Sequence, residues 1–278
     1  MKDGLIISLL SIIPKKPTAR LMGYSARIRF PKWLNRVFLK MFVWKYKVNM
    51  KESTSTLEDF QCLSDLFLRH LKEGCRPIDT QDDIWTSPVD GRIHSFGNIE
   101  KGLFHQNGDI FGSIHSLLGD DDLLTPQDFH SGSYMIIYLS PQDYHRVHSH
   151  KEGSLSKARY LPGRLWPVFP AATRKIRSLF DKNERLVFEL KNHNDTEIIA
   201  MIGAFGVGRM GSEFIDIESN LNLPQQDFEL NATVQRGQEI GYFALGSTVI
   251  LLWTHRNIKW CAQQGSPIRL GEKIAEVL

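Results

Sequence analysis

The distribution of apolar residues after Trp85 is the feature that most restricts how this chain can fold. From that point short apolar runs alternate with Gly, Pro, Asn and Asp, a pattern typical of β-strands joined by turns. The clearest runs are residues 134–139, 186–190, 198–202 and 249–253. Residues 87–93 predict a turn followed by another strand. We therefore expect a β-rich body, a sandwich or a barrel-like sheet, over residues 76–278.

Residues 1–75 show helical spacing instead. Two segments, residues 34–47 and 53–72, place apolar residues three and four positions apart, which predicts amphipathic helices. In the first segment the stripe consists of Leu34, Val37, Phe38, Met41 and Phe42. Helices followed by a β-rich body make the predicted fold class α+β, with a boundary near residue 75.

The charge of the chain is divided in the same way. Residues 1–50 contain eleven Lys or Arg and one acidic residue, a net charge of +10. The remaining residues contain 23 basic and 30 acidic residues, a net charge of −7. A basic end on an acidic body predicts an anionic partner at that end, and both nucleic acid and anionic lipid fit this description.

The apolar stripe near the basic end favours lipid. Cationic residues opposite aromatic and aliphatic ones are typical of a helix that lies in a membrane interface. The apolar run at residues 5–13 is too short to span a bilayer, which needs about 20 residues, and no small-residue cleavage site follows it. The alternative is a helix packed on the protein's own core. The residues predicted to contact the membrane are Trp33, Leu34, Val37, Phe38, Met41 and Phe42.

One short internal repeat gives a further indication of fold. The sequence Gly237-Gln-Glu-Ile-Gly-Tyr-Phe resembles Gly271-Glu-Lys-Ile-Ala-Glu-Val. A Gly-x-x-Ile at the start of a strand occurs in the hammerhead sandwiches of biotinyl and lipoyl carriers, so hammerhead-like repeats are expected in the body. The three cysteines have no metal or disulfide spacing, which suits a reducing compartment.

Leu245-Gly-Ser-Thr248 lies where chemistry could occur, directly before the apolar run at 249–253. Gly246 has no Cβ, so its carbonyl can be approached closely and its backbone can adopt unusual angles. The Ser247 hydroxyl could attack that carbonyl. The alternative is an ordinary turn that leads into a strand.

Three more residues could take part in catalysis. Asp90 lies in Pro88-Val-Asp-Gly91, and His145 and His148 lie in Tyr144-His-Arg-Val-His148. Asp, His and Ser can form a relay in which Ser attacks, His takes its proton and Asp orients the His. The period of an ideal strand would place the two histidines on opposite faces, so a shared site requires this piece to bend.

Two alternatives use other features of the sequence. His130, His148 and His150 could form a metal set, but no acidic residue or cysteine has matching spacing, so we expect no metal. The hammerhead repeat could instead belong to a carrier or binding module whose basic end holds nucleic acid. A carrier would need a modifiable Lys in a tight turn, and no Met-Lys pair lies between the two repeat units.

The motifs taken together resemble the bacterial, pyruvoyl-dependent phosphatidylserine decarboxylases over nearly the whole chain. The resemblance is carried by Leu245-Gly-Ser-Thr248, Tyr144-His-Arg-Val-His148, Pro88-Val-Asp-Gly91, Arg76-Pro-Ile-Asp79, Tyr46-Lys-Val-Asn-Met-Lys51, Tyr138-Leu-Ser-Pro-Gln-Asp143, Leu161-Pro-Gly163 and Asn183-Glu-Arg185. Two departures are Ser149-His150, where Met-Pro is frequent, and an altered glycine stretch at 206–208.

The resemblance implies a zymogen that makes its own cofactor. Cleavage between Gly246 and Ser247 would give a large chain, 1–246, and a small chain, 247–278, that stay together, while further homo-oligomerisation is left open. Ser247 would become a covalent pyruvoyl group that forms a Schiff base with phosphatidylserine and releases CO₂ and phosphatidylethanolamine. Asp90 and His148 would drive cleavage, and His145 would donate the proton in decarboxylation. The resemblance implies that the basic end binds the anionic cytoplasmic face of the cell membrane and not nucleic acid. The protein would be attached there peripherally.

Overall fold

The computed structural model describes residues 18, 21, 23–81, 83–119, 122–192, 195–205, 209–217, 219–221 and 223–278. The helices are α3 (Lys32–Tyr46), η1 (Met50–Glu52), α4 (Leu63–Phe67), α5 (Ile114–Leu118), η2 (Asp122–Leu124), η3 (Pro126–Phe129), α6 (Pro170–Thr173) and α7 (Leu179–Lys182). The strands are β1 (Ile84–Thr86), β2 (Gly91–Asn98), β3 (Leu103–Asn107), β4 (Ile110–Ser113), β5 (Ser133–Tyr138), β6 (Arg146–His148), β7 (Gly153–Leu161), β8 (Arg185–Asn192), β9 (Asp195–Ile202), β10 (Met210–Gly211), β11 (Gln226–Val234), β12 (Glu239–Phe243), β13 (Thr248–Trp253), β14 (Ile258–Trp260), β15 (Pro267–Ile268) and β16 (Lys273–Val277). The apolar run at 5–13 and the glycine stretch at 206–208 lie outside the described residues.

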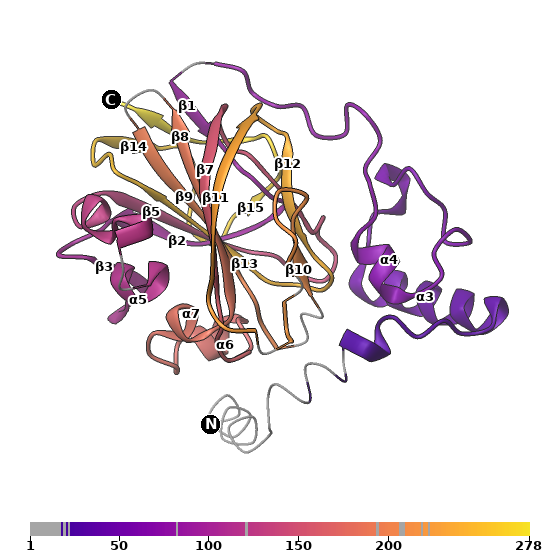
Figure 1. The fold of residues 1–278 in the computed structure, drawn as a ribbon. Helices are drawn as coiled ribbons and strands as arrows, with labels where there is room; N and C mark the ends of the chain where they lie inside the picture. Colours follow the sequence, from indigo (N-terminus) through magenta and orange to yellow (C-terminus); the bar gives the residue numbers. More distant parts are fainter. Residues whose placement is uncertain are drawn as a thin grey trace.

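The body is built on an eight-stranded sheet in the order β11-β7-β8-β9-β13-β5-β2-β15 (Figure 1). β13 pairs antiparallel with β9 on one side and β5 on the other, and all six of its residues are buried. An apolar strand with two neighbours and both faces covered is the most protected position that a sheet offers. The strands predicted at 134–139, 186–190, 198–202 and 249–253 are confirmed, and the fold is α+β.

The sheet does not close on itself. Its edge strands β11 and β15 are each paired with only one neighbour among the described residues, so the body is sandwich-like and not barrel-like. Two three-stranded sheets, β1-β16-β14 and β10-β12-β6, and a two-stranded sheet, β3-β4, make up the rest of its described strands.

The internal repeat is visible in those two smaller sheets as equivalent hydrogen bonds. The N–H of Gly271 donates to the carbonyl of Ser87 at 3.0 Å, and the N–H of Gly237 donates to the carbonyl of Ser149 at 2.8 Å. In return, Ser87 and Ser149 donate to the carbonyls of the residues after those glycines, Glu272 at 2.8 Å and Gln238 at 2.7 Å. Each glycine has a positive φ, near +80°, which favours Gly at both turns.

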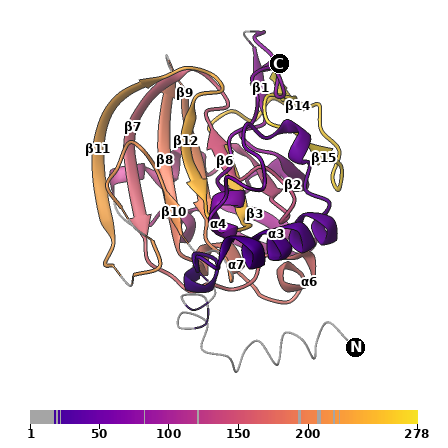
Figure 2. The same cartoon turned by 90° about the vertical axis from the view of Figure 1, so that its right-hand side faces the viewer.

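The helical N-terminal region lies against one side of the body. It is at the right of Figure 1, and in Figure 2 α3 and α4 lie in front of the strands. The region has a small apolar cluster of its own, in which Leu39, Phe60 and Leu66 are buried. No described helix is long and apolar enough to cross a bilayer.

One predicted helix is wrong for most of its length. The stripe at 53–72 forms only the five-residue helix α4, and residues 53–62 form turns. The cause is local, because the Asp59 carboxylate accepts hydrogen bonds from the N–H and the hydroxyl of Thr56, at 2.7 and 2.9 Å. Side chains that bond to the backbone in this way compete with helix formation. The helix expected at 34–47 is confirmed as α3, which begins two residues earlier.

Candidate active site

The Gly246–Ser247 peptide lies at the entrance to β13, whose six residues are all buried. β12 ends at Phe243, and the register of β13 is fixed before its first residue because Leu139 donates to the Ser247 carbonyl at 2.8 Å. The Ser247 side chain is fully buried, and its Oγ has no hydrogen-bond partner. A buried hydroxyl without a hydrogen-bond partner is costly, so Ser247 is a candidate for a chemical role.

Gly246 is closely surrounded. A Cβ at this position would lie 3.1 Å from the carbonyl oxygen of Leu139 and 3.5 Å from Nε2 of His145. The missing side chain therefore lets the backbone of the candidate cleavage bond lie directly beside the imidazole of His145. The sequence prediction that His145 shares a site with Gly246 and Ser247 is consistent with this placement.

His145 lies in the loop just before β6 and is fully buried. Its Nδ1 lies 2.8 Å from the carbonyl of Asp143, and since a carbonyl can only accept, Nδ1 carries the hydrogen. Nε2 therefore presents a lone pair, and it has no partner. Burial lowers the pKa of His145 to about 3, and the positive charge of Arg69 contributes to this. The ring is neutral at physiological pH.

His148, at the end of β6, has the same tautomer. Its Nδ1 lies 2.8 Å from the carbonyl of Gly237, and its buried Nε2 has no partner. Burial lowers the pKa of His148 to about 4, although the bond to Gly237 opposes this shift. His148 is thus a neutral imidazole with a free lone pair, as a general base requires.

Asp90 is engaged elsewhere. Its carboxylate accepts a hydrogen bond from Nε of Arg76 at 2.8 Å and a second hydrogen bond from the same guanidinium. It also accepts a hydrogen bond from the backbone N–H of Leu270 at 2.9 Å. Its charge still favours protonated His148, but His148 uses its only hydrogen-bonded nitrogen for Gly237. The relay that the resemblance implies is therefore not hydrogen-bonded in this form of the chain, and the roles of its three members stay predictions.

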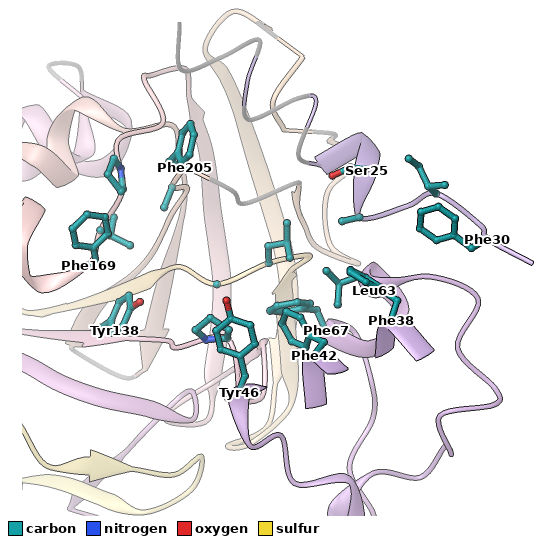
Figure 3. A pocket seen from close by; sticks show the side chains of 18 of the residues that line it. Ser25, Phe30, Phe38, Phe42, Tyr46, Leu63, Phe67, Tyr138, Phe169 and Phe205 are labelled. Atoms are coloured by element: carbon teal, nitrogen blue, oxygen red, sulfur yellow. The ribbon is translucent and has the colours of Figure 1, made fainter. Parts of the chain in front are cut away.

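A cavity of about 590 Å³ opens beside Gly246. Its walls are mostly apolar and come from both the N-terminal region and the body (Figure 3). Phe42 packs against Tyr46 and Phe67, with ring centroids 4.5 and 5.5 Å apart, and Phe67 in turn contacts the His145 ring at 4.7 Å. Packed aromatic rings thus connect α3 with the His145 ring, and the cavity beside them reaches Gly246.

The structure divides the predicted membrane-contact residues between two faces of α3. Trp33, Val37 and Met41 are exposed over 71%, 53% and 60% of their surface. The other three, Leu34, Phe38 and Phe42, line the cavity. The stripe of the sequence therefore has a fully solvent-facing part and a part that lines the cavity, in which Leu34 and Phe38 are also exposed over 36% of their surface.

Comparisons with known proteins identify the family of this chain. The family model described as Phosphatidylserine decarboxylase matches residues 63–276. A protein of Legionella pneumophila subsp. pneumophila named "Phosphatidylserine decarboxylase proenzyme" is 38% identical over 274 residues, 95% of each chain. Proteins with the same name are 32% identical over the whole of both chains in Myxococcus xanthus, and 34% identical in Saccharophagus degradans, over 100% of this chain and 99% of that one. This chain belongs to the phosphatidylserine decarboxylase family.

Some residues that shape this decarboxylase-family site could not be assigned a role from sequence. Arg69 donates to the carbonyls of Gln142 and Asp143, at 3.1 Å each, and so holds the loop that carries His145. No spacing pattern distinguishes Arg69 from other arginines. Arg76 and Gly237, in contrast, do lie in sequence features already noted, namely the motif at 76–79 and the internal repeat.

The histidines considered as a metal set have separate partners. His130 lies 2.8 Å from His115, and His150 contacts Glu197, whereas His148 uses Gly237. Within the described part of the chain, no three His, Cys, Asp or Glu residues gather as metal ligands would.

Proposed function

We propose that this chain is a self-processing phosphatidylserine decarboxylase that cleaves itself between Gly246 and Ser247. The observation that carries the proposal is the placement of this peptide, with a buried unpartnered hydroxyl on one side and an apolar cavity on the other. The word "proenzyme" in the names of the relatives supports a maturation step.

In the maturation step the Ser247 Oγ attacks the Gly246 carbonyl, and the peptide bond becomes an ester as the Ser247 nitrogen is released as an amine. A base, His148 in our proposal, then removes the Ser247 α-proton, and elimination frees the Gly246 carboxylate at the end of chain 1–246. The remaining dehydroalanine tautomerises to an imine, and water displaces ammonia to leave a pyruvoyl group on Thr248. Every atom comes from the chain and one water molecule.

The residues present fit such a group. It would be held covalently at the start of β13, whose two neighbouring strands fix it in place. When present, it supplies an electron sink for the electrons that remain when CO₂ leaves. We assign to His145 the return of a proton to the substrate. Since its ring is neutral in this form, it must first gain a proton, and an anionic substrate beside it would raise its pKa.

The cavity and α3 support a lipid substrate. The apolar walls suit acyl chains, and burial of such chains contributes about 0.8 kcal/mol per methylene. We propose that the exposed face of α3 and the basic charge of residues 1–50 bring the protein to the anionic cytoplasmic face of the membrane as a peripheral protein. The two chains would remain associated, because β13 stays between β9 and β5 after cleavage.

Intact-mass measurement of the purified protein tests the proposal. We expect two species, chains 1–246 and 247–278, with the smaller one blocked to Edman degradation. A Ser247→Ala protein should stay whole and should not release CO₂ from phosphatidylserine. An uncleaved wild-type protein that decarboxylates phosphatidylserine would refute the maturation step, and a cleaved one without that activity would refute the substrate.

A further inference from the structure

The segment 76–79, which joins the N-terminal region to the body, crosses both glycine turns of the internal repeat. A Cβ on Gly237 would lie 2.9 Å from Cγ1 of Ile78, and a Cβ on Gly271 would lie 2.7 Å from Cδ1 of the same side chain. The Ile78 side chain therefore packs against both glycines, and at Gly271 the carbonyl oxygen of Pro77, 2.6 Å from such a Cβ, fills the space with it. Such close approach explains the need for glycine at both turns beyond their positive φ angles.

Each of these turns holds one residue of the proposed cleavage machinery. The Gly237 carbonyl accepts Nδ1 of His148 at 2.8 Å. At the equivalent turn, the N–H of Leu270, the residue before Gly271, donates to the Asp90 carboxylate at 2.9 Å. The positions of the candidate base and of its carboxylate thus depend on two backbone turns that Ile78 contacts together.

The rest of the segment is fixed on both sides of Ile78. Arg76, whose side chain is only 9% exposed, binds Asp90 and also Glu52, at 2.9 Å. The N–H of Asp79 donates to the Gly271 carbonyl at 3.1 Å, and Arg236 donates to the carbonyl of Asp79 at 2.9 Å. The segment is therefore anchored to Asp90 at one end and to both repeat units at the other.

We propose that residues 76–79 act as a brace for self-cleavage, in which Ile78 and Arg76 are positioning residues that hold His148 as the Nδ1–H tautomer and Asp90 beside it. This inference rests on the proposed role of His148 as the cleavage base. Neither side chain touches the reacting bond. The brace acts by preserving the hydrogen bond between Nδ1 of His148 and the Gly237 carbonyl, so that the lone pair on Nε2 of His148 stays available to accept a proton.

Shortening Ile78 gives a defined expectation. The Gly237 turn would gain room to move, the bond to Nδ1 would loosen, and water would reach the imidazole. The pKa of His148 would then rise from about 4 toward the ordinary histidine value of about 6.5. The titratable and charged groups around it, which remain in the variant, are Arg146, Asp90, His70, Tyr144 and Glu239.

The first experiment reads the imidazole directly and does not depend on cleavage. In uncleavable Ser247→Ala protein, the ¹⁵N chemical shifts of His148 should report the Nδ1–H tautomer and a low pKa. Adding Ile78→Ala should give a mixture of tautomers and a higher pKa, whereas Ile78→Val, which keeps the β-branch, should restore both. The matched control is Ile258→Ala, at a partly buried isoleucine on the edge strand β14.

The second experiment measures cleavage in chains that keep Ser247. We expect Ile78→Ala to slow cleavage about 10- to 100-fold, as displacements at a catalytic group do, and to move the acid limb of its pH profile upward. Arg76→Gln should slow cleavage, and Arg76→Lys should restore it partly. Thermal melting identifies unfolded variants. If Ile78→Ala does not fold, Ile78→Leu, which conserves volume, takes its place. We expect Ile78→Leu to slow cleavage and to raise the acid limb in the same direction, by a smaller amount.

The brace is overturned if Ile78→Ala leaves the tautomer and pKa of His148 as they are in the Ile258→Ala control. It is also overturned if the two variants cleave at the same rate with the same acid limb. Failure of the proposed function looks different, because wild-type protein would then not cleave at all while the ¹⁵N measurement still reported the tautomer.

Discussion

The β-rich body and the helical N-terminal region differ in how much of their apolar surface they bury. The body has one extensive core around the fully buried strand β13, while the described part of the N-terminal region buries Leu39, Phe60 and Leu66 in a small cluster of its own. Of the fourteen large apolar side chains exposed among the described residues, ten lie within residues 21–44. A region that exposes so much apolar surface next to its positive charge has the properties of a lipid-binding surface. The closely packed body, in contrast, can hold the side chains of the candidate site in fixed positions.

The two regions also differ in where they leave polar groups without partners. The described residues contain ten buried side-chain atoms with no hydrogen bond, and four of them belong to His145, His148, Ser247 and Thr248. Each such group costs on the order of 1–3 kcal/mol. Half of the eight such atoms in the body thus belong to the two candidate histidines and to the two residues after the candidate cleavage bond. The predictions below ask how far chemistry and membrane contact can be separated.

The largest effect is expected within the body, where the two histidines should act at different steps. Loss of a general base typically slows a reaction about 10²–10⁴-fold, so His148→Ala should slow self-cleavage by that factor. Asp90→Asn should also slow self-cleavage. His145→Ala should cleave but should not decarboxylate phosphatidylserine. Mass spectrometry measures cleavage, and ¹⁴CO₂ release measures turnover; the opposite pattern would exchange the two roles.

The next effect compares the two cores by the same substitution. A buried Leu→Ala change costs about 2–5 kcal/mol, more where the surroundings cannot collapse into the space. Leu251→Ala, in β13, should lie at the upper end and should also impair cleavage. Leu39→Ala, in the N-terminal cluster, should lie at the lower end and should still cleave. Urea unfolding of both variants in a Ser247→Ala background provides the comparison, and equal costs would mean that the two clusters behave as one.

The sequence predicted the body better than it predicted the N-terminal region, for a physical reason. In the body, the apolar run at 249–253 is buried on both faces, so composition alone indicates a strand. In residues 53–72 the helical spacing competes with local bonds such as those of Asp59, which periodicity does not detect. The division of α3 into two faces depends on a cavity that only the folded chain forms.

The candidate site shows the same limit. Gly246, Ser247 and the two histidines could be singled out from the sequence because their motifs resemble those of a family. The sequence could not show that Nδ1 of His148 donates a hydrogen bond to the Gly237 carbonyl, or that Arg76 donates hydrogen bonds to the Asp90 carboxylate. These contacts join residues up to 89 positions apart. Long-range pairing of this kind has no local signal.

A moderate effect is expected on stability at acid pH. The pKa values of His145 and His148, lowered to about 3 and about 4, lie below the unfolded value of about 6.5. The unfolded chain therefore binds more protons, and the stability present above about pH 6.5 is lost as the pH falls toward about 4 for His148 and about 3 for His145. In Ser247→Ala protein, His145→Gln should reduce this acid sensitivity. An unchanged dependence of melting temperature on pH would show that the ring is not held neutral by burial.

The smallest effect, and the sharpest test of separation, compares the two faces of α3. Replacing the exposed Trp33, Val37 and Met41 by Ser removes apolar surface that would enter the bilayer, while the chemistry remains in the body. We expect weaker binding to anionic vesicles even at low salt, with unchanged self-cleavage. The charge contributes about 1 kcal/mol for each basic residue near the surface and is screened by salt, so high salt should release the wild-type protein only in part.

Replacing Phe38 and Phe42 by Ser changes the face that lines the cavity. This variant should bind vesicles more nearly like the wild type and should still cleave, because the altered walls contact the lipid and not the Gly246–Ser247 bond. Its turnover of phosphatidylserine should fall with both vesicle and detergent-dispersed substrate, whereas the exposed-face variant should lose turnover mainly on vesicles. If the exposed-face variant failed to cleave, that face would belong to the folded core, and α3 would be a packed helix of the body and not its contact with the membrane.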